Sequence, residues 1–280
     1  MNEQGPSTPV PTTPLNDGRR LPVIGLGTWP LDDDGAERVV STALELGYRH
    51  IDTAVPYGNE VGVGRALASS SLPREELFVV TKLDGPFQGD DKAVAGLDAS
   101  LDRLGLGYVD LVLIHWPLPA RDLYVNTWRT FERLQEAGKA LSIGVSNFKP
   151  AHLQRLAAET SVVPAVNQVQ LNPYVTREDH TAYHRENGVV TVAYSPIGKG
   201  GAMLEDPVIM QIAEAHGRTP AQVVLRWHLQ LGHVVIPKSS NPLRLRENLD
   251  VFGFELDQQQ LGAISGLSRG DGVDADVKGH

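Results

Sequence analysis

Eight short apolar runs recur along the 280-residue chain, and stretches with helical spacing separate them. The runs cover residues 23–27, 50–52, 77–82, 109–115, 141–145, 165–168, 189–194 and 234–237. Strands that alternate with helices form parallel sheets, and eight such units favour a closed barrel over an open sheet. We therefore expect an α/β fold of the (β/α)8 TIM-barrel type.

Acidic residues and glycines mark the expected helix ends. After the aspartates at 32–34, the apolar residues at 36, 39, 40, 43 and 44 fall on one helical stripe, which Gly47 ends. Similar stripes end at Gly105 and Gly138. Acidic residues favour helix starts and glycine favours the position after the last turn, so these signals predict helices between the strands.

The N-terminal segment predicts a separate small element. Asn16-Asp17-Gly18 is a turn signal between two short extended runs, which predicts a β-hairpin before the barrel. We expect residues 1–9 to form a disordered tail and residues 10–280 to form one domain, because neither a repeat nor a linker divides them. No basic start precedes an apolar run, so we expect no signal peptide.

Composition limits the partners. The formal charge is −9, apolar residues make up 41% and the chain has no cysteine. An acidic chain offers no footprint for nucleic acid or an anionic membrane, and no disulfide or thiolate metal site can form. No run of apolar residues is long enough to span a bilayer. We expect a cytoplasmic protein without metal, nucleic acid or membrane as a partner.

Polar side chains end three consecutive predicted strands, where TIM barrels place their active sites. These are Asp52, Lys82 and His115, and Tyr57 lies in the loop after Asp52. A nearby ammonium lowers the pKa of a tyrosine, and a buried lysine keeps its charge when a carboxylate pairs with it. Tyr57, Lys82 and Asp52 thus predict a proton donor, with His115 placed to orient a carbonyl oxygen.

None of these side chains supplies a nucleophile for the carbonyl carbon, so a hydride-carrying cofactor is implied. Each residue also has a structural interpretation: the Asp–Lys pair as a rim ion pair, the histidine as a satisfied rim residue, the tyrosine as packing. The convergence of all four on neighbouring strand ends favours catalysis.

A basic cluster follows the last predicted strand. Lys238, Arg244 and Arg246 stand out in an acidic chain, and TIM barrels often bind phosphate after strands 7 and 8. The alternative is a solvated helix face. The chain lacks the Gly-x-Gly-x-x-Gly fingerprint of Rossmann cofactor sites. The glycines of 198–201 instead predict a flexible loop over a pyrophosphate.

Four motifs carry a resemblance to a known family. The first covers residues 47–54 and continues to Tyr57, Asn59 and Glu60, and the second covers residues 111–117, which end in His-Trp-Pro. The third covers residues 144–148, and the fourth covers residues 236–239 and continues to Arg244, Glu247 and Asn248. In this order and spacing, the segment from about 10 to 251 resembles the aldo-keto reductases. It is most similar to the bacterial branch that includes 2,5-diketo-D-gluconate reductases.

The resemblance implies a monomeric, NADPH-dependent enzyme of the NADP⁺ alcohol dehydrogenase class. Such an enzyme reduces small carbonyl compounds, such as keto-sugars or dicarbonyls. It makes Tyr57 the general acid, with Asp52, Lys82 and His115 as its catalytic partners. It assigns cofactor contacts to Gly27, Thr28, Trp29, Ser146, Asn147, Gln168, Tyr194, Ser195, Lys238, Ser239, Arg244, Glu247 and Asn248. Trp29, Tyr57 and Trp116 would line the substrate pocket.

Within these assignments, Ser146, Asn147 and Gln168 would hold the nicotinamide carboxamide and Tyr194 would stack on its ring. Lys238, Ser239 and Arg244 would hold the 2′-phosphate.

Two features leave the substrate open. The segment Leu83-Asp84-Gly85 stands where some relatives carry an aromatic pocket wall, and the polar tail 270–280 lies where such tails shape the pocket in the family. Two other functions compete with the reductase. One is a non-catalytic NADPH-binding sensor or scaffold, which need not keep the proton donor. The other is a barrel hydrolase or lyase, for which we find neither a metal-ligand set nor a Ser-His-Asp arrangement.

Overall fold

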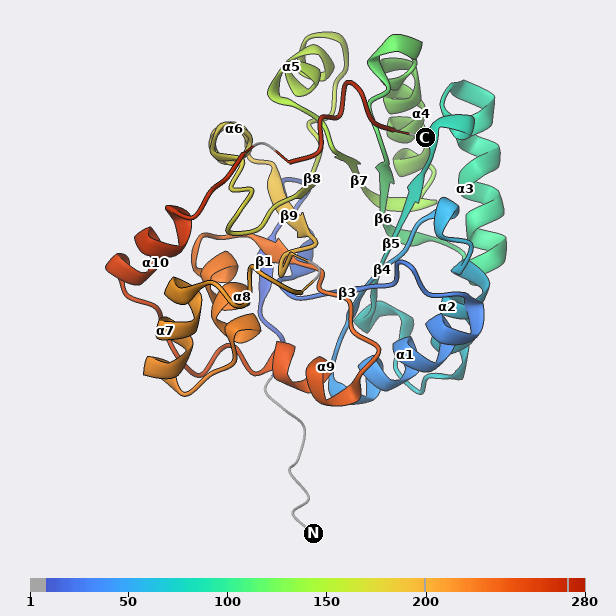
Figure 1. Cartoon of the computed structure of the whole chain (residues 1–280). Helices are drawn as coiled ribbons and strands as arrows, with labels where there is room; N and C mark the ends of the chain where they lie inside the picture. The colour runs from blue at the N-terminus through green and yellow to red at the C-terminus, as the bar shows by residue number, and fades with distance from the viewer. Residues whose placement is uncertain (1–8, 199, 271, 280) are drawn as a thin grey trace.

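The computed structural model describes residues 9–198, 200–270 and 272–279. Within these residues, eight parallel strands lie side by side in chain order from β3 to β10. The ring closes because Ile24 bridges Val235, and the Gly25 N–H donates to the Val235 carbonyl oxygen at 2.8 Å. Figure 1 shows the helices arranged around the strands. The expected (β/α)8 barrel is therefore confirmed.

Each predicted run overlaps one strand of the ring. The strands are β3 (Leu26–Gly27), β4 (His50–Asp52), β5 (Phe78–Leu83), β6 (Val109–Ile114), β7 (Ala140–Ser146), β8 (Val166–Gln170), β9 (Val190–Tyr194) and β10 (Val234–Val235). The observed ends differ from the predicted ones by a few residues. β10 stops early, before Pro237, which has no N–H to donate to a neighbouring strand.

The described helices are α1 (Asp33–Leu46), α2 (Glu60–Ser69), α3 (Asp90–Leu104), α4 (Tyr124–Glu136), α5 (Pro150–Glu159), α6 (Glu178–Glu186), α7 (Pro207–His216), α8 (Pro220–Gln230), α9 (Pro242–Leu249) and α10 (Gln258–Ser265). Three of them, α1, α3 and α4, end at or within two residues of the predicted glycine signals. Asp32 accepts from the Gly35 N–H at 2.8 Å at the start of α1. Gly47 ends that helix with φ 107°, a conformation that glycine adopts without strain. Short 3₁₀ turns include η1 (Val55–Tyr57), η3 (Gly85–Phe87) and η4 (Pro119–Arg121).

The predicted hairpin closes one end of the ring. Strands β1 (Thr12–Pro14) and β2 (Arg20–Pro22) pair antiparallel, and Gly18 takes φ 86° in the turn. Leu15 and Leu21 are buried in a cluster with Phe78, Val166 and other residues from the starts of the strands. The hairpin therefore covers the amino ends of several strands, and their carboxyl ends form the open end of the ring. Of the expected tail 1–9, residues 1–8 lie outside the described part.

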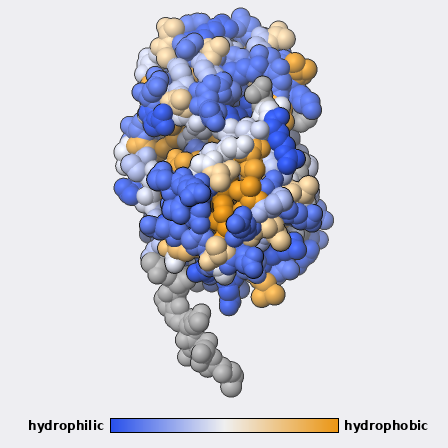
Figure 2. Space-filling model, turned by 60° about the vertical axis from the view of Figure 1, so that its left-hand side comes forward, coloured by the Kyte–Doolittle hydropathy of each residue, from blue (hydrophilic) through white to orange (hydrophobic). Residues whose placement is uncertain are grey.

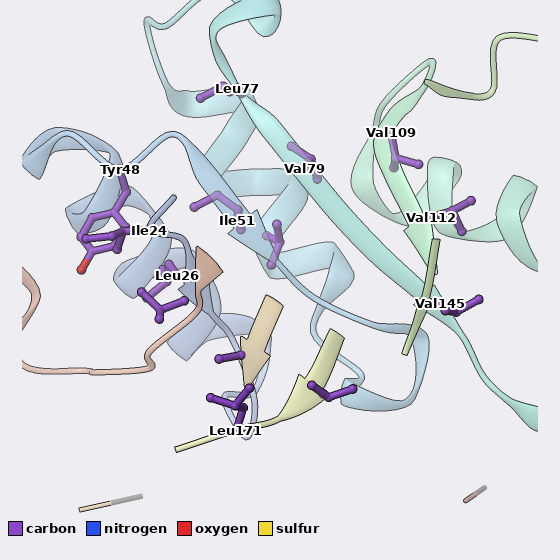
Figure 3. Close-up of a cluster of buried hydrophobic side chains, with 14 of the residues drawn as sticks. Ile24, Leu26, Tyr48, Ile51, Leu77, Val79, Val109, Val112, Val145 and Leu171 are labelled. Atoms are coloured by element: carbon purple, nitrogen blue, oxygen red, sulfur yellow. The ribbon is translucent and has the colours of Figure 1, made fainter. Parts of the chain in front are cut away.

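The main hydrophobic core lies between the ring and its helices. Figure 3 shows part of it, which includes Ile24, Tyr48, Ile51 and Val79. The Tyr48 hydroxyl also donates to the Leu245 carbonyl oxygen of α9 at 3.0 Å. This bond fixes α9, which carries part of the basic cluster, against the segment that leads into β4.

No helix in the described part of the chain is both long and apolar enough to cross a membrane. On the face drawn in Figure 2, hydrophilic residues surround a hydrophobic area near the centre. Apolar atoms contribute much of the surface of any folded protein. This face alone therefore does not identify a binding partner.

Buried histidines connect the barrel to its helices. The Nε2 atom of His184 on α6 lies 2.8 Å from Asn167 Nδ2 of β8, and its Nδ1 lies 2.9 Å from Thr191 Oγ1 of β9. Burial lowers the pKa of His184 to about 3. Burial also lowers the pKa of His50 to about 4, although Asp52 opposes this. Both rings are therefore neutral in the folded protein at neutral pH.

We predict that the protein loses stability as the pH falls through the window from 6.5 toward 4. The unfolded histidines bind protons below about pH 6.5, whereas the folded ones do not until the pH is much lower. One pH unit below 6.5, each such histidine lowers the free energy of unfolding by about 1.4 kcal/mol. Urea unfolding at pH 7.5 and 5.5 measures the effect. His184→Gln should give a shallower pH dependence, and a flat wild-type profile would contradict the prediction.

Candidate active site

Four predicted side chains meet at the open end of the ring. Asp52 is the last residue of β4, Lys82 lies near the end of β5, and His115 directly follows β6. Tyr57 ends the 3₁₀ turn η1 after β4. Neighbouring parallel strands present their carboxyl ends at the same edge, so residues distant in the sequence come together here.

Lys82 is the centre of this cluster, and its side chain is fully buried. Its Nζ donates to Asp52 Oδ1 at 2.5 Å, to the Thr53 carbonyl oxygen at 3.0 Å and to the Tyr57 hydroxyl at 3.4 Å. Burial alone would lower the pKa of Lys82, but Asp52 and Tyr57 outweigh it and raise that pKa. The ammonium therefore stays charged next to the Tyr57 oxygen.

Asp52 is held through both carboxylate oxygens. While Oδ1 accepts from Lys82, Oδ2 accepts from Gln168 Nε2 of β8 at 2.7 Å. The amide nitrogen of Gln168, a predicted nicotinamide contact, is thus already engaged with the ion pair. Asp52 and Gln168 together fix the position of the lysine.

The half-buried Tyr57 differs from the expectation in one respect. Burial raises the pKa of its hydroxyl above the ordinary value, and the opposing effect of Lys82 is smaller. We expected the ammonium to lower this pKa; the lysine acts in that direction, but removal of the hydroxyl from water outweighs it. The hydroxyl consequently keeps its proton at neutral pH and can act as a proton donor.

His115 faces the Tyr57 ring edge-on, with the ring centroids 6.0 Å apart. Its Nδ1 atom lies 3.4 Å from Asp84 Oδ1, and both side chains are buried. Burial lowers the pKa of His115, although Asp84 opposes this. Asp84 had no predicted role, yet it follows Lys82 by two residues at a strand end, the same signal that singles out the lysine.

A second set of predicted residues forms a hydrogen-bonded row at the ends of β7 and β9. Asn147 Nδ2 donates to Ser146 Oγ and to the His115 carbonyl oxygen, both at 3.1 Å. The Tyr194 hydroxyl donates to Asn147 Oδ1 at 2.9 Å, and burial raises its pKa to about 12. Asn147 and Ser195 have positive φ angles of 63° and 50°, which turn the chain sharply at the ends of two strands. This row contacts His115 through Asn147, and Ser195 also lines the cavity described next.

The third set of predicted residues lines a cavity of about 690 Å³ beside the strand ends. It contains the predicted contacts Ser195, Lys238, Ser239, Arg244, Glu247 and Asn248. Arg246, the third member of the basic cluster, is not among the described lining residues. Gly200 and Gly201 also line the cavity, as expected for a loop above it, whereas Lys199 lies outside the described residues.

The side chain of Asn241 caps the N-terminus of α9 and so determines which donors are left for an anion in this cavity. Asn241 Oδ1 accepts from the Leu243 N–H at 2.9 Å and the Arg244 N–H at 3.4 Å. Since the cap occupies these donors, the side chains of Lys238, Ser239 and Arg244 remain to hold an anionic group. Lys238 Nζ currently donates to Ser240 Oγ at 2.9 Å.

The remaining predicted residues lie around the opening. Thr28 is buried, and its hydroxyl donates to the Asp52 carbonyl oxygen at 3.0 Å. At Gly27 a Cβ would lie 2.9 Å from the Ile236 carbonyl oxygen, so the residue permits close contact across the closing seam. Trp29 is 52% exposed and Trp116 is half-buried. None of these four lines the cavity in the described part of the chain.

The C-terminal segment crosses toward the same opening, as Figure 1 shows for the dark red end of the chain. Lys149 Nζ lies 2.6 Å from carboxylate oxygens of both Asp274 and Asp276. At Gly279 an added Cβ would lie 3.1 Å from Trp116 Cβ, so the backbone runs directly over that indole. Residues 271 and 280 lie outside the described part. These contacts join sequence positions too far apart for a local pattern to reveal.

Comparison with known proteins gives consistent results. The model of the aldo/keto reductase family matches residues 23–269. An aldo-keto reductase of Mycolicibacterium smegmatis is 50% identical over 96% of this chain and 97% of its own. A 2,5-diketo-D-gluconic acid reductase B of Corynebacterium sp. is 48% identical over 97% and 98% of the two chains. The crystal structure of a Gox0644 mutant in complex with NADPH is 43% identical, with a TM-score of 0.93 over 98% of this chain and all of the other.

Proposed function

Because this chain belongs to the aldo/keto reductase family, we propose that it reduces aldehydes or ketones to alcohols with NADPH and that Tyr57 is the general acid. The observation that carries the proposal is the buried Lys82 ammonium, which bridges Asp52 and the Tyr57 hydroxyl. The NADPH complex of the related Gox0644 mutant supports the choice of cofactor. The activity would belong to the NADP⁺-dependent alcohol dehydrogenase class.

The catalytic cluster has a distinct task for each residue. Tyr57 donates a proton to the carbonyl oxygen as negative charge develops there. The Lys82 ammonium stabilises the tyrosinate that this transfer leaves, and Asp52 keeps Lys82 charged in its buried position. His115 lies across the Tyr57 ring, where it can contact the oxygen end of the substrate and fix its orientation.

The cavity beside the cluster fits the dinucleotide. It offers the two cations Lys238 and Arg244 with the Ser239 hydroxyl for a 2′-phosphate, and Glu247 and Asn248 for the adenine. The row of Ser146, Asn147 and Tyr194 leads from there to the catalytic cluster and would hold the nicotinamide. When bound, the reduced nicotinamide supplies the hydride for the carbonyl carbon.

Retention of the whole proton-donor cluster supports catalysis over the alternative of a cofactor-binding sensor or scaffold. A sensor would need the cavity but not a buried lysine held against a tyrosine hydroxyl. Incubation with NADPH and a reactive dicarbonyl, followed by the absorbance of the reduced nicotinamide, tests the proposal directly. Binding of NADPH without turnover of any carbonyl would favour the sensor.

We predict that Tyr57→Phe lowers kcat by about 10²–10⁴-fold, because the proton donor to the carbonyl oxygen is removed. The dissociation constant of NADPH should change little, since the Tyr57 hydroxyl acts on the reacting oxygen rather than on the nucleotide. Steady-state kinetics and a cofactor titration measure both quantities. A kcat near the wild-type value would show that another group donates the proton.

We predict that Arg244→Ala weakens NADPH binding by roughly ten- to a hundredfold and leaves NADH binding nearly unchanged. The guanidinium can bind phosphate oxygens through charge-assisted hydrogen bonds of about 1.5–3 kcal/mol, and about 1.4 kcal/mol corresponds to a factor of ten. Arg244 is exposed, so added salt should reduce the wild-type preference.

Arg246→Ala is a matched control for this prediction, because Arg246 is exposed on the same helix. The dissociation constants of both cofactors should stay near their wild-type values in this variant. Equal weakening of NADPH and NADH by Arg244→Ala would mean that the arginine supports the fold or the adenine instead.

We predict that Lys149→Ala raises the KM for a bulky carbonyl substrate by about two- to fivefold, while the affinity for NADPH is unchanged. The variant loses partly exposed ion pairs that hold the C-terminal segment near Trp116, and such pairs contribute about 0.2–1 kcal/mol each. Lys139→Ala, which breaks a similar pair with Asp98, serves as the control. An unchanged KM in Lys149→Ala would show that the segment does not shape the pocket.

A further inference from the structure

A carboxylate outside the proton-donor cluster reaches the same opening. Asp84 directly follows β5, its side chain is buried, and its Oδ1 atom lies 3.4 Å from His115 Nδ1. Within the described residues, neither lysine nor arginine lies within ion-pair distance of this carboxylate. Oδ1 also has no conventional hydrogen-bond partner there. The negative charge of Asp84 is therefore not neutralised by a direct contact.

The other charges of the opening do not compensate for it. Asp52 and Lys82 form a pair that is neutral as a unit. His115 is uncharged at neutral pH because burial lowers its pKa. Arg121 on η4 contacts the residue after Asp84, because its Nη1 atom donates to the Gly85 carbonyl oxygen at 2.6 Å. The side chain does not pair with the Asp84 carboxylate, and the residue is exposed. Within the described residues, the Asp84 carboxylate thus lies beside His115, the residue that would face the substrate, without a cation at ion-pair distance.

We propose that Asp84 is a specificity-determining residue, which makes the enzyme prefer uncharged carbonyl compounds to carbonyl compounds that carry a carboxylate. The inference deepens the proposed function and rests on it. A substrate carbonyl positioned at Tyr57 and His115 brings its neighbouring groups close to Asp84. At an effective dielectric constant of about 20, two like charges ~8 Å apart repel strongly enough to lower affinity by at least about tenfold.

The charge of Asp84 would disfavour the kind of substrate that the name of one relative suggests. The Corynebacterium relative is named a 2,5-diketo-D-gluconic acid reductase, and that compound is an acid. An acid of this kind is ionised at neutral pH, so its carboxylate would be repelled by Asp84. Uncharged aldehydes, ketones and dicarbonyls would not be.

Methyl phenylglyoxylate and phenylglyoxylate form a suitable substrate pair, because they differ in one ester and one carboxylate next to the same ketone. The wild-type enzyme should have the higher kcat/KM for the ester. In Asp84→Asn, which removes the charge and keeps the shape, the acid-to-ester ratio of kcat/KM should rise by at least about tenfold. Dividing by the ester value cancels any general loss of activity.

Asp102→Asn is the matched control, because Asp102 is exposed on α3, and its ratio should equal that of the wild type. Asp84→Ser also lacks the charge and should raise the ratio, so the result does not depend on one variant folding well. An unchanged ratio in both Asp84 variants, or a wild-type preference for the acid, would overturn the inference.

Binding of unreactive ligands separates this inference from the proposed function. Benzamide and benzoate differ in charge at a similar size, and tryptophan fluorescence of the NADPH-loaded protein can follow their binding. Benzoate should bind at least about tenfold more tightly to Asp84→Asn than to the wild type, while benzamide shows no such gain. If this shift appears without reduction of any carbonyl, the charge selection holds and the proposed reductase function fails. If reduction occurs without the shift, the proposed reductase function holds and the charge selection by Asp84 fails.

Discussion

The open end of the barrel depends on a single buried charge, the ammonium of Lys82. Removing an ion from water costs several kcal/mol unless an opposite charge and further hydrogen bonds replace the solvent. Asp52 supplies the charge, the Thr53 carbonyl accepts a second bond, and Gln168 fixes the other oxygen of Asp52. Strands β4, β5 and β8 must therefore keep their relative positions if Lys82 is to stay protonated. The same contacts hold the cation beside the hydroxyl of Tyr57.

Much of the fold could be predicted from local sequence signals. Strands such as β6 are buried on both faces, so they appear as continuous apolar runs. Gly18 and Gly47 adopt positive φ angles where the turn and helix-end signals place them. The strand-end pattern also predicted that Asp52, Lys82 and His115 meet at the open end of the ring. It could not show that Asp84 lies beside His115, because that distance depends on how two strands are spaced. The net direction of the Tyr57 pKa shift depends on the depth of burial, which no motif encodes.

At the cavity beside the strand ends, the backbone and the side chains of the short helix α9 have different roles. Asn241 caps the first turn of α9, so the exposed ends of the backbone contribute little to anion binding. Recognition then depends on which side chains the helix turns inward. Residues two positions apart on a helix point in different directions, which is why Arg244 lines the cavity and Arg246 does not. A count of basic residues in the sequence could not distinguish them.

The hairpin of β1 and β2 makes the two ends of the barrel structurally different. It covers the amino ends of the strands, whereas the last described residues of the chain pass over Trp116 at the opposite end. An affinity tag, a fusion partner or an immobilisation linker joined before Val10 would leave the opening accessible. The same attachment after Gly279 would lie next to Trp116 and Leu118.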